Sequence, residues 1–144
     1  MANEATVRCG LTIINGNFRF RTAIDAFVAT VTGTKGPVPG SITVTEAGTD
    51  IDLDELSAFG GLMVAYNYDA ANRVEIGIYD PDTFHFVPVW ELLPGEGCLG
   101  RLSRNFGEYF SGSQLGTGTV GTDANLRAKA YGGSVNIFFG AFDP

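Results

Sequence analysis

The chain has few of the residues that reactive or metal-binding sites need. Of its 144 residues, two are cysteine, one is histidine and one is tryptophan. Cys9 and Cys98 lie far apart and outside any CxxC spacing, which argues against a zinc site. We expect two buried free thiols, because cysteine packs as a small hydrophobic residue, and a single disulfide is the alternative.

Positive charge is also scarce, since the chain has two lysines and a net charge of −7. Phosphate contacts from basic side chains supply most nucleic-acid affinity, so we expect no nucleic-acid partner. No apolar run approaches the ~20 residues that a membrane-spanning helix needs. The start, MANEATVR, has neither region of a signal peptide, so we expect a soluble product of a cytoplasm and no membrane partner.

Glycine and phenylalanine are abundant, with 20 and 11 residues, while charged residues make up 17% of the chain. This composition favours one globular domain over residues 1–144, rich in strands and tight turns. The stretch from Leu62 to Arg104 is the clearest part, because Asp, Asn, Pro and Gly punctuate it repeatedly. It predicts four consecutive strands with mostly hairpin connections, at Leu62–Tyr68, Arg73–Tyr79, Phe84–Leu93 and Cys98–Arg104.

The segments before and after this stretch also favour strands. Thr6–Ile14 predicts a strand, and Asn15-Gly16 a type I′ hairpin turn. Phe18–Thr32 alternates with a period of two, which favours one long strand, or two joined by a bulge, over a helix at Thr22–Ala29. Further strands are expected at Ser41–Glu46, Leu126–Tyr131 and Ser134–Phe142.

Eight to ten antiparallel strands without a βαβ unit predict an all-β fold with at most one short helical turn. The expected architecture is an antiparallel sandwich of jelly-roll or related Greek-key type. Two segments, Gly33–Gly40 and Asn105–Asn125, have the composition of flexible loops. In an assembly such loops can reach a neighbour, which makes their anchors candidate partner-binding residues: Lys35, Pro37, Pro39, Phe106, Tyr109, Phe110 and Leu115.

An acidic segment, Thr49–Gly61, begins like a calcium loop, with Asp50-x-Asp52-x-Asp54. Glycine at the sixth position and glutamate at the twelfth are missing, so the motif fails. We expect a short edge strand, or one helical turn over Asp54–Ala58, with the aspartates in solvent. A surface cation site shared with Asp80 or Asp82 is the alternative.

The aromatic strand Phe84–Leu93 contains the single histidine, His85. Its alternation predicts a solvent-facing or hydrogen-bonded histidine, with Phe84, Phe86 and Trp90 in the core. A sugar-binding platform made by the aromatic residues is the alternative.

Carboxylates are the remaining candidates for chemistry. Glycoside hydrolysis needs two acids about 5–10 Å apart, and the sequence does not place any pair at that distance. The candidates are Glu75, Glu91, Glu96 and Glu108. A GxSxG elbow and a phosphate loop are missing, so we assign no catalytic, cofactor-binding or metal residue and expect a protein that is not an enzyme.

Turn and strand patterns run through the central part of the chain, at Asp50–Leu53, Gly60, Asn67–Asp69, Val74–Gly77, Phe86–Pro88, Leu93–Glu96 and Arg101–Leu102. With these patterns the chain resembles a group of small β-rich proteins encoded by tailed bacteriophages. The similarity extends to the MANE start and the closing LRAKA and SVNIFF strands, and covers roughly two thirds of the chain.

This resemblance implies a virion structural protein, a β-sandwich on the capsid or tail, made in the host cytoplasm. It implies no catalytic residues and no cofactor. We expect a capsid decoration or cement protein, or another virion-surface protein, that binds other virion proteins of the capsid or tail and forms a homo-oligomer. A host-recognition or carbohydrate-binding module of a phage tail or fibre is the alternative, which an exposed aromatic strip beside Trp90 would favour. A small hydrolase is the third hypothesis, weakened by the lack of a nucleophile–base set.

Overall fold

The structure is a computed structural model that describes residues 3–9, 12–21, 25–31, 38–53, 56, 61–81, 83–101 and 125–142. Within these ranges the regular elements are all strands, paired in antiparallel ladders, which confirms the predicted all-β class. No helix in the described part is long and apolar enough to cross a membrane. The strands are β1 (Asn3–Cys9), β2 (Thr12–Asn15), β3 (Phe18–Arg21), β4 (Asp25–Val31), β5 (Val38–Val44), β6 (Thr49–Asp50), β7 (Leu62–Asn67), β8 (Arg73–Asp80), β9 (His85–Leu92), β10 (Gly97–Arg101), β11 (Asn125–Tyr131) and β12 (Val135–Ala141).

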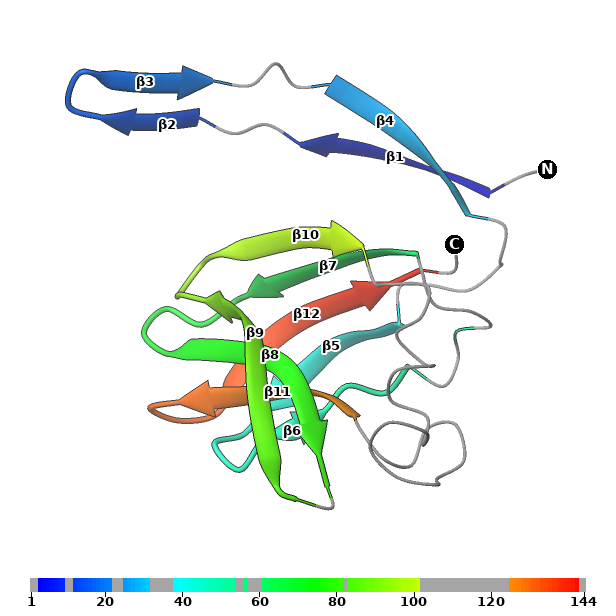
Figure 1. The fold of residues 1–144 in the computed structure, drawn as a ribbon, viewed down its shortest axis with the longest axis vertical. Helices are drawn as coiled ribbons and strands as arrows, with labels where there is room; N and C mark the ends of the chain where they lie inside the picture. The colour runs from blue at the N-terminus through cyan, green and yellow to red at the C-terminus, as the bar shows by residue number, and fades with distance from the viewer. Residues whose placement is uncertain are drawn as a thin grey trace.

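Two four-stranded sheets form a sandwich (Figure 1), with strand orders β10-β7-β12-β5 and β6-β11-β8-β9. Alternate residues of β7, β11 and most of β12 are buried between them, as the period of two along a strand requires. The core is aliphatic with one large aromatic residue, Phe139. Its buried members are Val44, Ile51, Leu53, Met63, Ala65, Val74, Ile76, Leu92, Leu126, Ala128, Ala130, Val135, Ile137, Phe139 and Ala141.

The strands of the sandwich pair as a nested set. β5 pairs with β12, β6 with β11, β7 with β10 and β8 with β9. Of the four central strands only β8 and β9 therefore form a hairpin, while β7–β8 and β9–β10 connect one sheet to the other. The prediction of mostly hairpin connections is wrong here, because hairpin turns and sheet-to-sheet corners use the same Asp, Asn, Pro and Gly residues.

A buried amide, Asn67, ties two of these corners together. Its side chain has no exposed surface, and Nδ2 donates hydrogen bonds to the carbonyls of Asn72 (2.9 Å) and Leu92 (3.2 Å). Its Oδ1 accepts from the backbone N–H of Asp69 at 2.9 Å. A buried polar side chain is stable only when its hydrogen bonds are satisfied, so Asn67 fixes where the chain leaves β7.

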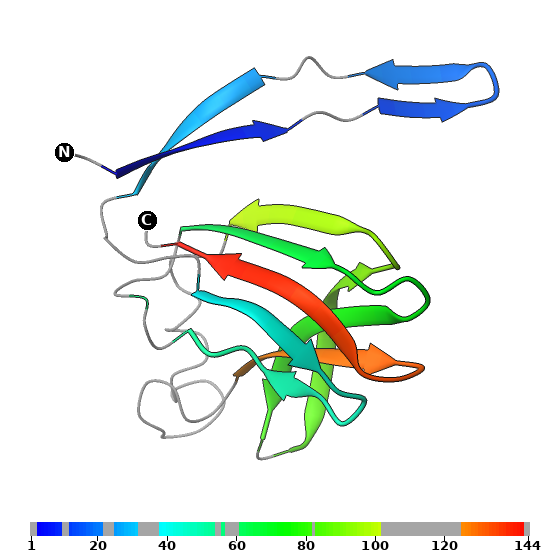
Figure 2. The same cartoon turned by 180° about the vertical axis from the view of Figure 1, so that it is seen from behind.

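The first four strands form a two-stranded ribbon, which we call the arm. Figures 1 and 2 show it set apart from the two sheets. The ladder between β1 and β4 pairs Asn3 with Val31. The ladder between β2 and β3, at the tip of the arm, pairs Thr12 with Arg21. The register moves by one residue between the ladders, because three residues separate β3 from β4 and two separate β1 from β2.

The arm confirms the prediction of two strands within Phe18–Thr32 and contradicts a helix at Thr22–Ala29, since β4 begins at Asp25. The predicted strand Thr6–Ile14 is divided between β1 and β2. The predicted type I′ turn at Asn15-Gly16 is wrong by one residue. Asn15 pairs with Phe18, so Gly16 and Asn17 form the turn. Gly16 has φ +56 and Asn17 has no positive φ, as in a type II′ turn.

Three further predictions concern loops and edges. β5 begins at Val38, so residues 38–40 of the predicted loop Gly33–Gly40 belong to a strand. Pro39 pairs with Gly140, and because β5 is an edge strand the backbone N–H that proline lacks is not needed there. Asn125 likewise belongs to β11. The expected short edge strand is β6. Residues 33–37 and 105–124, and most of the possible helical turn Asp54–Ala58, lie outside the described residues.

The predicted strand Phe84–Leu93 corresponds to β9, which begins one residue later, at His85. Phe84 is 79% exposed rather than in the core, because it lies in the turn before β9 with φ +58. Phe86 and Trp90 are half-buried, and Trp90 packs against the core. His85 is exposed, as predicted.

Candidate interaction surface

The two sheets present outer faces of opposite character. The strands β5, β7, β10 and β12 contain a single charged residue, Arg101. The strands of the other sheet contain seven: Asp50, Arg73, Glu75, Asp80, Glu91, Arg127 and Lys129. We call the solvent side of the first sheet the β7 face and that of the second sheet the β8 face.

Apolar and aromatic side chains form the centre of the β7 face. Tyr66 stands opposite Phe138 on β12, and Val64 stands opposite Leu99 on β10. Tyr66 and Leu99 are each 39% exposed. The ring of Tyr68 lies 5.0 Å from that of Tyr66, at a tilt of 58°. These side chains alternate along the strands with core residues, so their exposure follows from the register.

The sequence of β7 explains this surface. Leu62–Tyr66 is apolar at five consecutive positions, so both faces of the strand carry apolar side chains. Such runs are typical of strands that are covered on both sides. Here Met63 and Ala65 are buried in the sandwich, while Leu62 and Val64 are half-buried on the outer side.

An open hollow of about 390 Å³ lies at one end of the β7 face. Thr43 Oγ1 donates to Asn136 Oδ1 at 2.8 Å in its wall, and Tyr68 is 59% exposed beside it. A mostly apolar hollow with a few polar groups in its wall, beside an exposed aromatic ring, is suited to a ligand with both hydroxyl groups and an apolar face. The lining residues are Ser41, Ile42, Thr43, Tyr68, Asn136 and Ile137.

The charges of the β8 face are engaged with one another. Arg73 Nε lies 3.3 Å from Glu91 Oε1, and the Arg73 guanidinium lies 4.6 Å from the centroid of the Tyr131 ring. Tyr131 donates from its hydroxyl to Glu75 Oε2 at 2.7 Å. This bond stabilises the protonated phenol beside a carboxylate, so it raises the pKa of Tyr131.

A second group on the β8 face surrounds Arg127. Its guanidinium lies 3.3 Å from the centroid of the Tyr79 ring, and its Nε donates to Asp50 Oδ1. The hydrogen bond to Asp50 raises the pKa of Arg127. Asn125 Nδ2 also donates to Asp50, at 3.2 Å. Asp50, the first residue of the failed calcium motif, therefore belongs to a structural ion pair.

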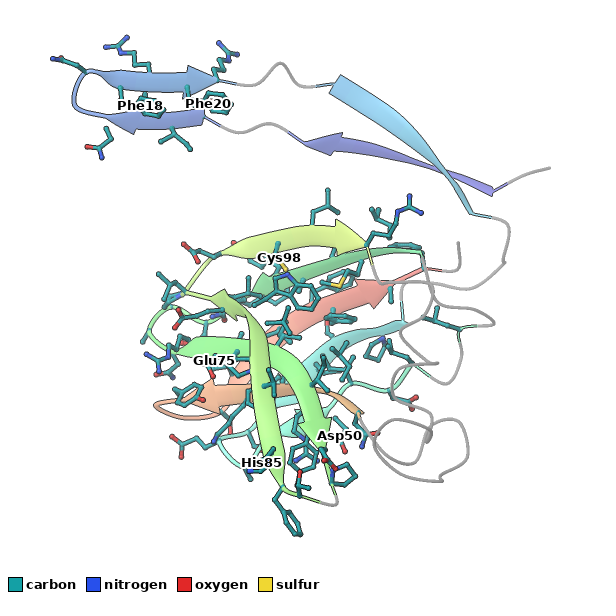
Figure 3. The ribbon with its side chains drawn as sticks, viewed as in Figure 1. Phe18, Phe20, Asp50, Glu75, His85 and Cys98 are labelled. Carbon is teal, nitrogen blue, oxygen red and sulfur yellow. The ribbon has the colours of Figure 1, made fainter. Side chains whose placement is uncertain are left out.

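The structure places several of the candidate chemical groups. Glu75 and Glu91 stand directly opposite each other across β8 and β9 (Figure 3 labels Glu75), and each is bonded to another residue, Tyr131 or Arg73. Glu96 accepts from the backbone N–H of Leu93 at 3.0 Å. Glu108 lies outside the described residues.

The structure describes part of the acidic segment Thr49–Gly61 and the side chain of one of the two cysteines. Ile51 and Leu53 are buried and Asp52 is exposed, as the alternation predicted. Asp54 and Asp82 are not among the described residues, and within those that are, no three His, Cys, Asp or Glu side chains form a metal-binding group. Cys98 is a free, half-buried thiol whose pKa is raised by burial, so the disulfide alternative is not adopted.

Of the predicted partner-binding residues the structure describes only Pro39, which lies in the edge strand β5, and its role stays a prediction. The other six, Lys35, Pro37, Phe106, Tyr109, Phe110 and Leu115, lie outside the described residues. Most of the exposed apolar residues that sequence reasoning missed are on regular strands, whereas Tyr68, Phe84 and Leu93 lie just outside them. The signal for Tyr66 was the five-residue apolar run of β7, which indicates two apolar faces without telling which one is open.

Comparison with known protein families, with curated proteins and with solved structures gave no match.

Proposed function

We propose that this chain is a non-enzymatic virion structural protein, a capsid decoration or cement protein, that acts through protein–protein contacts as a homo-oligomer. The observation that supports it most is the β7 face, an apolar sheet surface with exposed aromatic residues and one charged residue on its four strands. Depletion of charge and enrichment in tyrosine and phenylalanine are characteristic of the centre of protein interfaces.

The chemistry of the β8 face adds to this proposal. Its carboxylates are held in ion pairs and hydrogen bonds that link neighbouring strands, at Arg73–Glu91, Tyr131–Glu75 and Arg127–Asp50. Such pairs stiffen a sheet and keep its surface hydrated. A reaction site would instead leave an acid or base directed into a cleft.

The connectivity fits a further part of the proposal, that the sandwich is a jelly roll. A jelly roll is an eight-stranded, two-sheet arrangement that recurs in viral capsid proteins. The nested pairs β5–β12, β6–β11, β7–β10 and β8–β9, which alternate between the two sheets, support this topology. The resemblance to phage proteins supports the viral setting.

Co-sedimentation with purified capsids that lack this protein tests the proposal. We expect the wild-type chain to co-sediment, and Tyr66→Glu to weaken binding about tenfold or more, since it places a charge at the centre of an apolar contact. Glu91→Gln on the β8 face is the matched control and should bind as the wild type does. Failure of the wild-type chain to bind any virion particle would contradict the proposal.

A carbohydrate-binding module is the second candidate, favoured by the hollow beside Tyr68. Trp90, which would have anchored an exposed strip, is half-buried against the core, so a sugar would stack on Tyr68 instead. A glycan array with the wild-type chain and Tyr68→Ala tests this. Glycan binding that depends on Tyr68, with no particle association, would replace the structural proposal.

A further inference from the structure

The arm is a ribbon that two strands alone do not stabilise well. Its ladders run from Asn3 opposite Val31 to Asn15 opposite Phe18, and its strands pair with each other rather than with either sheet. An isolated two-stranded ribbon is marginal in water, and packing on another surface is what makes such a ribbon stable.

The tip of the arm, β2 and β3, has one apolar face and one basic face. Cross-strand partners share a face, so Ile13 and Phe20 lie together and Phe18 joins them two residues along. The opposite face carries Arg19 and Arg21, and with them Thr12 and Ile14, which is 67% exposed. The exposed fractions are 59% for Phe18, 45% for Phe20 and 40% for Ile13, and Figure 3 shows both phenylalanines away from the sandwich.

The arm and the rest of the chain have opposite net charge. Residues 1–31 contain three arginines and two carboxylates, a net charge of +1. Because the whole chain carries −7, the remaining residues carry −8. The strands of the β7 face carry one cation, Arg101, and two carboxylates, Asp69 and Glu96, border the face next to Tyr68 and Gly97. A basic arm is therefore attracted to the acidic body of another copy.

We propose that the tip of the arm docks its Ile13, Phe18 and Phe20 face onto the β7 face of a second copy of this chain. The inference rests on the homo-oligomer of the proposed function and names its contact. One chain carries both halves of the interface, an exposed apolar tip and an exposed apolar sheet face. Two copies that exchange arms cover both at once, in the manner of a domain swap.

Light scattering of the full chain over a range of concentrations tests this contact. Phe20→Glu on the tip and Tyr66→Glu on the β7 face should each weaken association about tenfold or more, because each places a charge in an apolar contact. Val87→Glu, at a 58%-exposed position on β9, is the matched control and should associate as the wild type does. Circular dichroism checks that each variant is folded.

A mixing experiment separates exchange between copies from docking within one copy. In a mixture of the Phe20→Glu and Tyr66→Glu chains, an intact arm meets an intact face once per pair, so association should return in part. An arm that docks on its own chain gives no recovery. Raising the salt from about 0.05 to 0.5 M should weaken the wild-type complex, since screening removes the attraction of the arginines.

The other possible results of these experiments would contradict the proposed contact between the arm and the β7 face. They differ from the result that would contradict the structural role itself. A wild-type chain that is monomeric in solution and binds capsids keeps the structural role and rejects the exchange. An oligomer that survives both substitutions keeps homo-oligomerisation and rejects the arm as its contact. Loss in the Phe20→Glu chain alone places the arm on another surface, which also rejects the β7 face.

Discussion

The β7 and β8 faces belong to one sandwich, share one core and differ in almost everything that faces solvent. The β8 face carries arginines, a lysine and carboxylates on neighbouring strands. Arg73 pairs with Glu91, Arg127 pairs with Asp50, and Glu75 accepts a hydrogen bond from Tyr131. The β7 face carries tyrosine, leucine, valine and phenylalanine, with Arg101 as the only charged residue of its strands. The difference shows that the buried core does not determine which residues lie on the outer side of a sheet. The residues of each outer face therefore have to be interpreted separately when a function is proposed.

The energetic difference between the faces is also clear. Exposed ion pairs contribute little to stability, typically below about 1 kcal/mol each, so the β8 face mainly provides solubility and local order. An exposed apolar side chain gains about 1.5–3 kcal/mol when it becomes fully buried, so the β7 face gains most when it is covered. The β8 face would gain little from being covered, whereas the β7 face would be stabilised if a partner covered it.

The largest expected effect comes from the residue that holds the two sheets in place, Asn67. In Asn67→Asp a carboxylate would face the carbonyls of Asn72 and Leu92, to which it cannot donate. We expect a loss of about 3 kcal/mol or more in the free energy of unfolding at neutral pH. Urea denaturation measures it.

The pH dependence of that loss has a definite sign. Burial beside two carbonyls would raise the pKa of the introduced carboxyl above its unfolded value, so the penalty is present at neutral pH and shrinks as the pH falls. Asn136→Asp, at an exposed position whose Oδ1 only accepts from Thr43, is the control and should change stability by less than about 0.5 kcal/mol. Equal losses in both variants would show that Asn67 is not a special anchor.

Substitution of one glycine in each sheet should give the next largest difference in stability. A Cβ on Gly77 of β8 would lie 2.1 Å from the carbonyl oxygen of Val87, where β9 approaches closely at a register shift. A Cβ on Gly100 of β10 would meet only the Met63 side chain, at 3.8 Å. Gly77→Ala should therefore cost about 2 kcal/mol and Gly100→Ala less than about 0.5 kcal/mol, measured by thermal unfolding. A neutral Gly77→Ala would mean that β9 can move away.

The sequence was sufficient to locate the strands of the sandwich. The alternation in Arg73–Tyr79 and Leu126–Tyr131 and the turn residues between the runs gave boundaries within one or two residues of β8 and β11. The connections were not predictable, because the Asp-Ala-Ala-Asn segment after β7 is a corner that depends on the long-range bond from Asn67 to Leu92. No pattern in the sequence around Asn67 predicts a hydrogen bond to a residue so far along the chain.

The candidate surface was harder to predict for a related reason. The run Leu62–Tyr66 shows that β7 has two apolar faces, but which neighbour covers each face is a tertiary property. Phe84 is the opposite case, a residue predicted to be buried that is exposed. Its place next to a strand suggested a core position, but it lies in a turn with φ +58 and its side chain is in solvent. Only the three-dimensional arrangement separates covered from open hydrophobic residues.

The ion pairs of the β8 face should differ in strength according to burial. The Arg127 side chain is 19% exposed and lies over Tyr79, whereas the side chains of Arg73 and Glu91 are each about half exposed. Arg127→Ala should lower stability by about 1 kcal/mol and Arg73→Ala by about 0.3 kcal/mol. Urea denaturation at low and high salt measures both. Equal, salt-independent losses would contradict the role assigned to the ion pair and the cation–π contact.

The smallest expected effect is the titration of Tyr131. Because its hydroxyl donates to Glu75, its pKa lies above the ordinary tyrosine value of 10.0. The bond therefore stabilises the fold below the unfolded pKa, and this contribution is lost as the pH rises through the folded pKa. Glu75→Gln should shift one tyrosine to lower pH in an absorbance titration near 295 nm. Glu96→Gln, near the other face, should leave the titration unchanged; a wild-type curve in both variants would mean that the β8 face is not the bonded network described above.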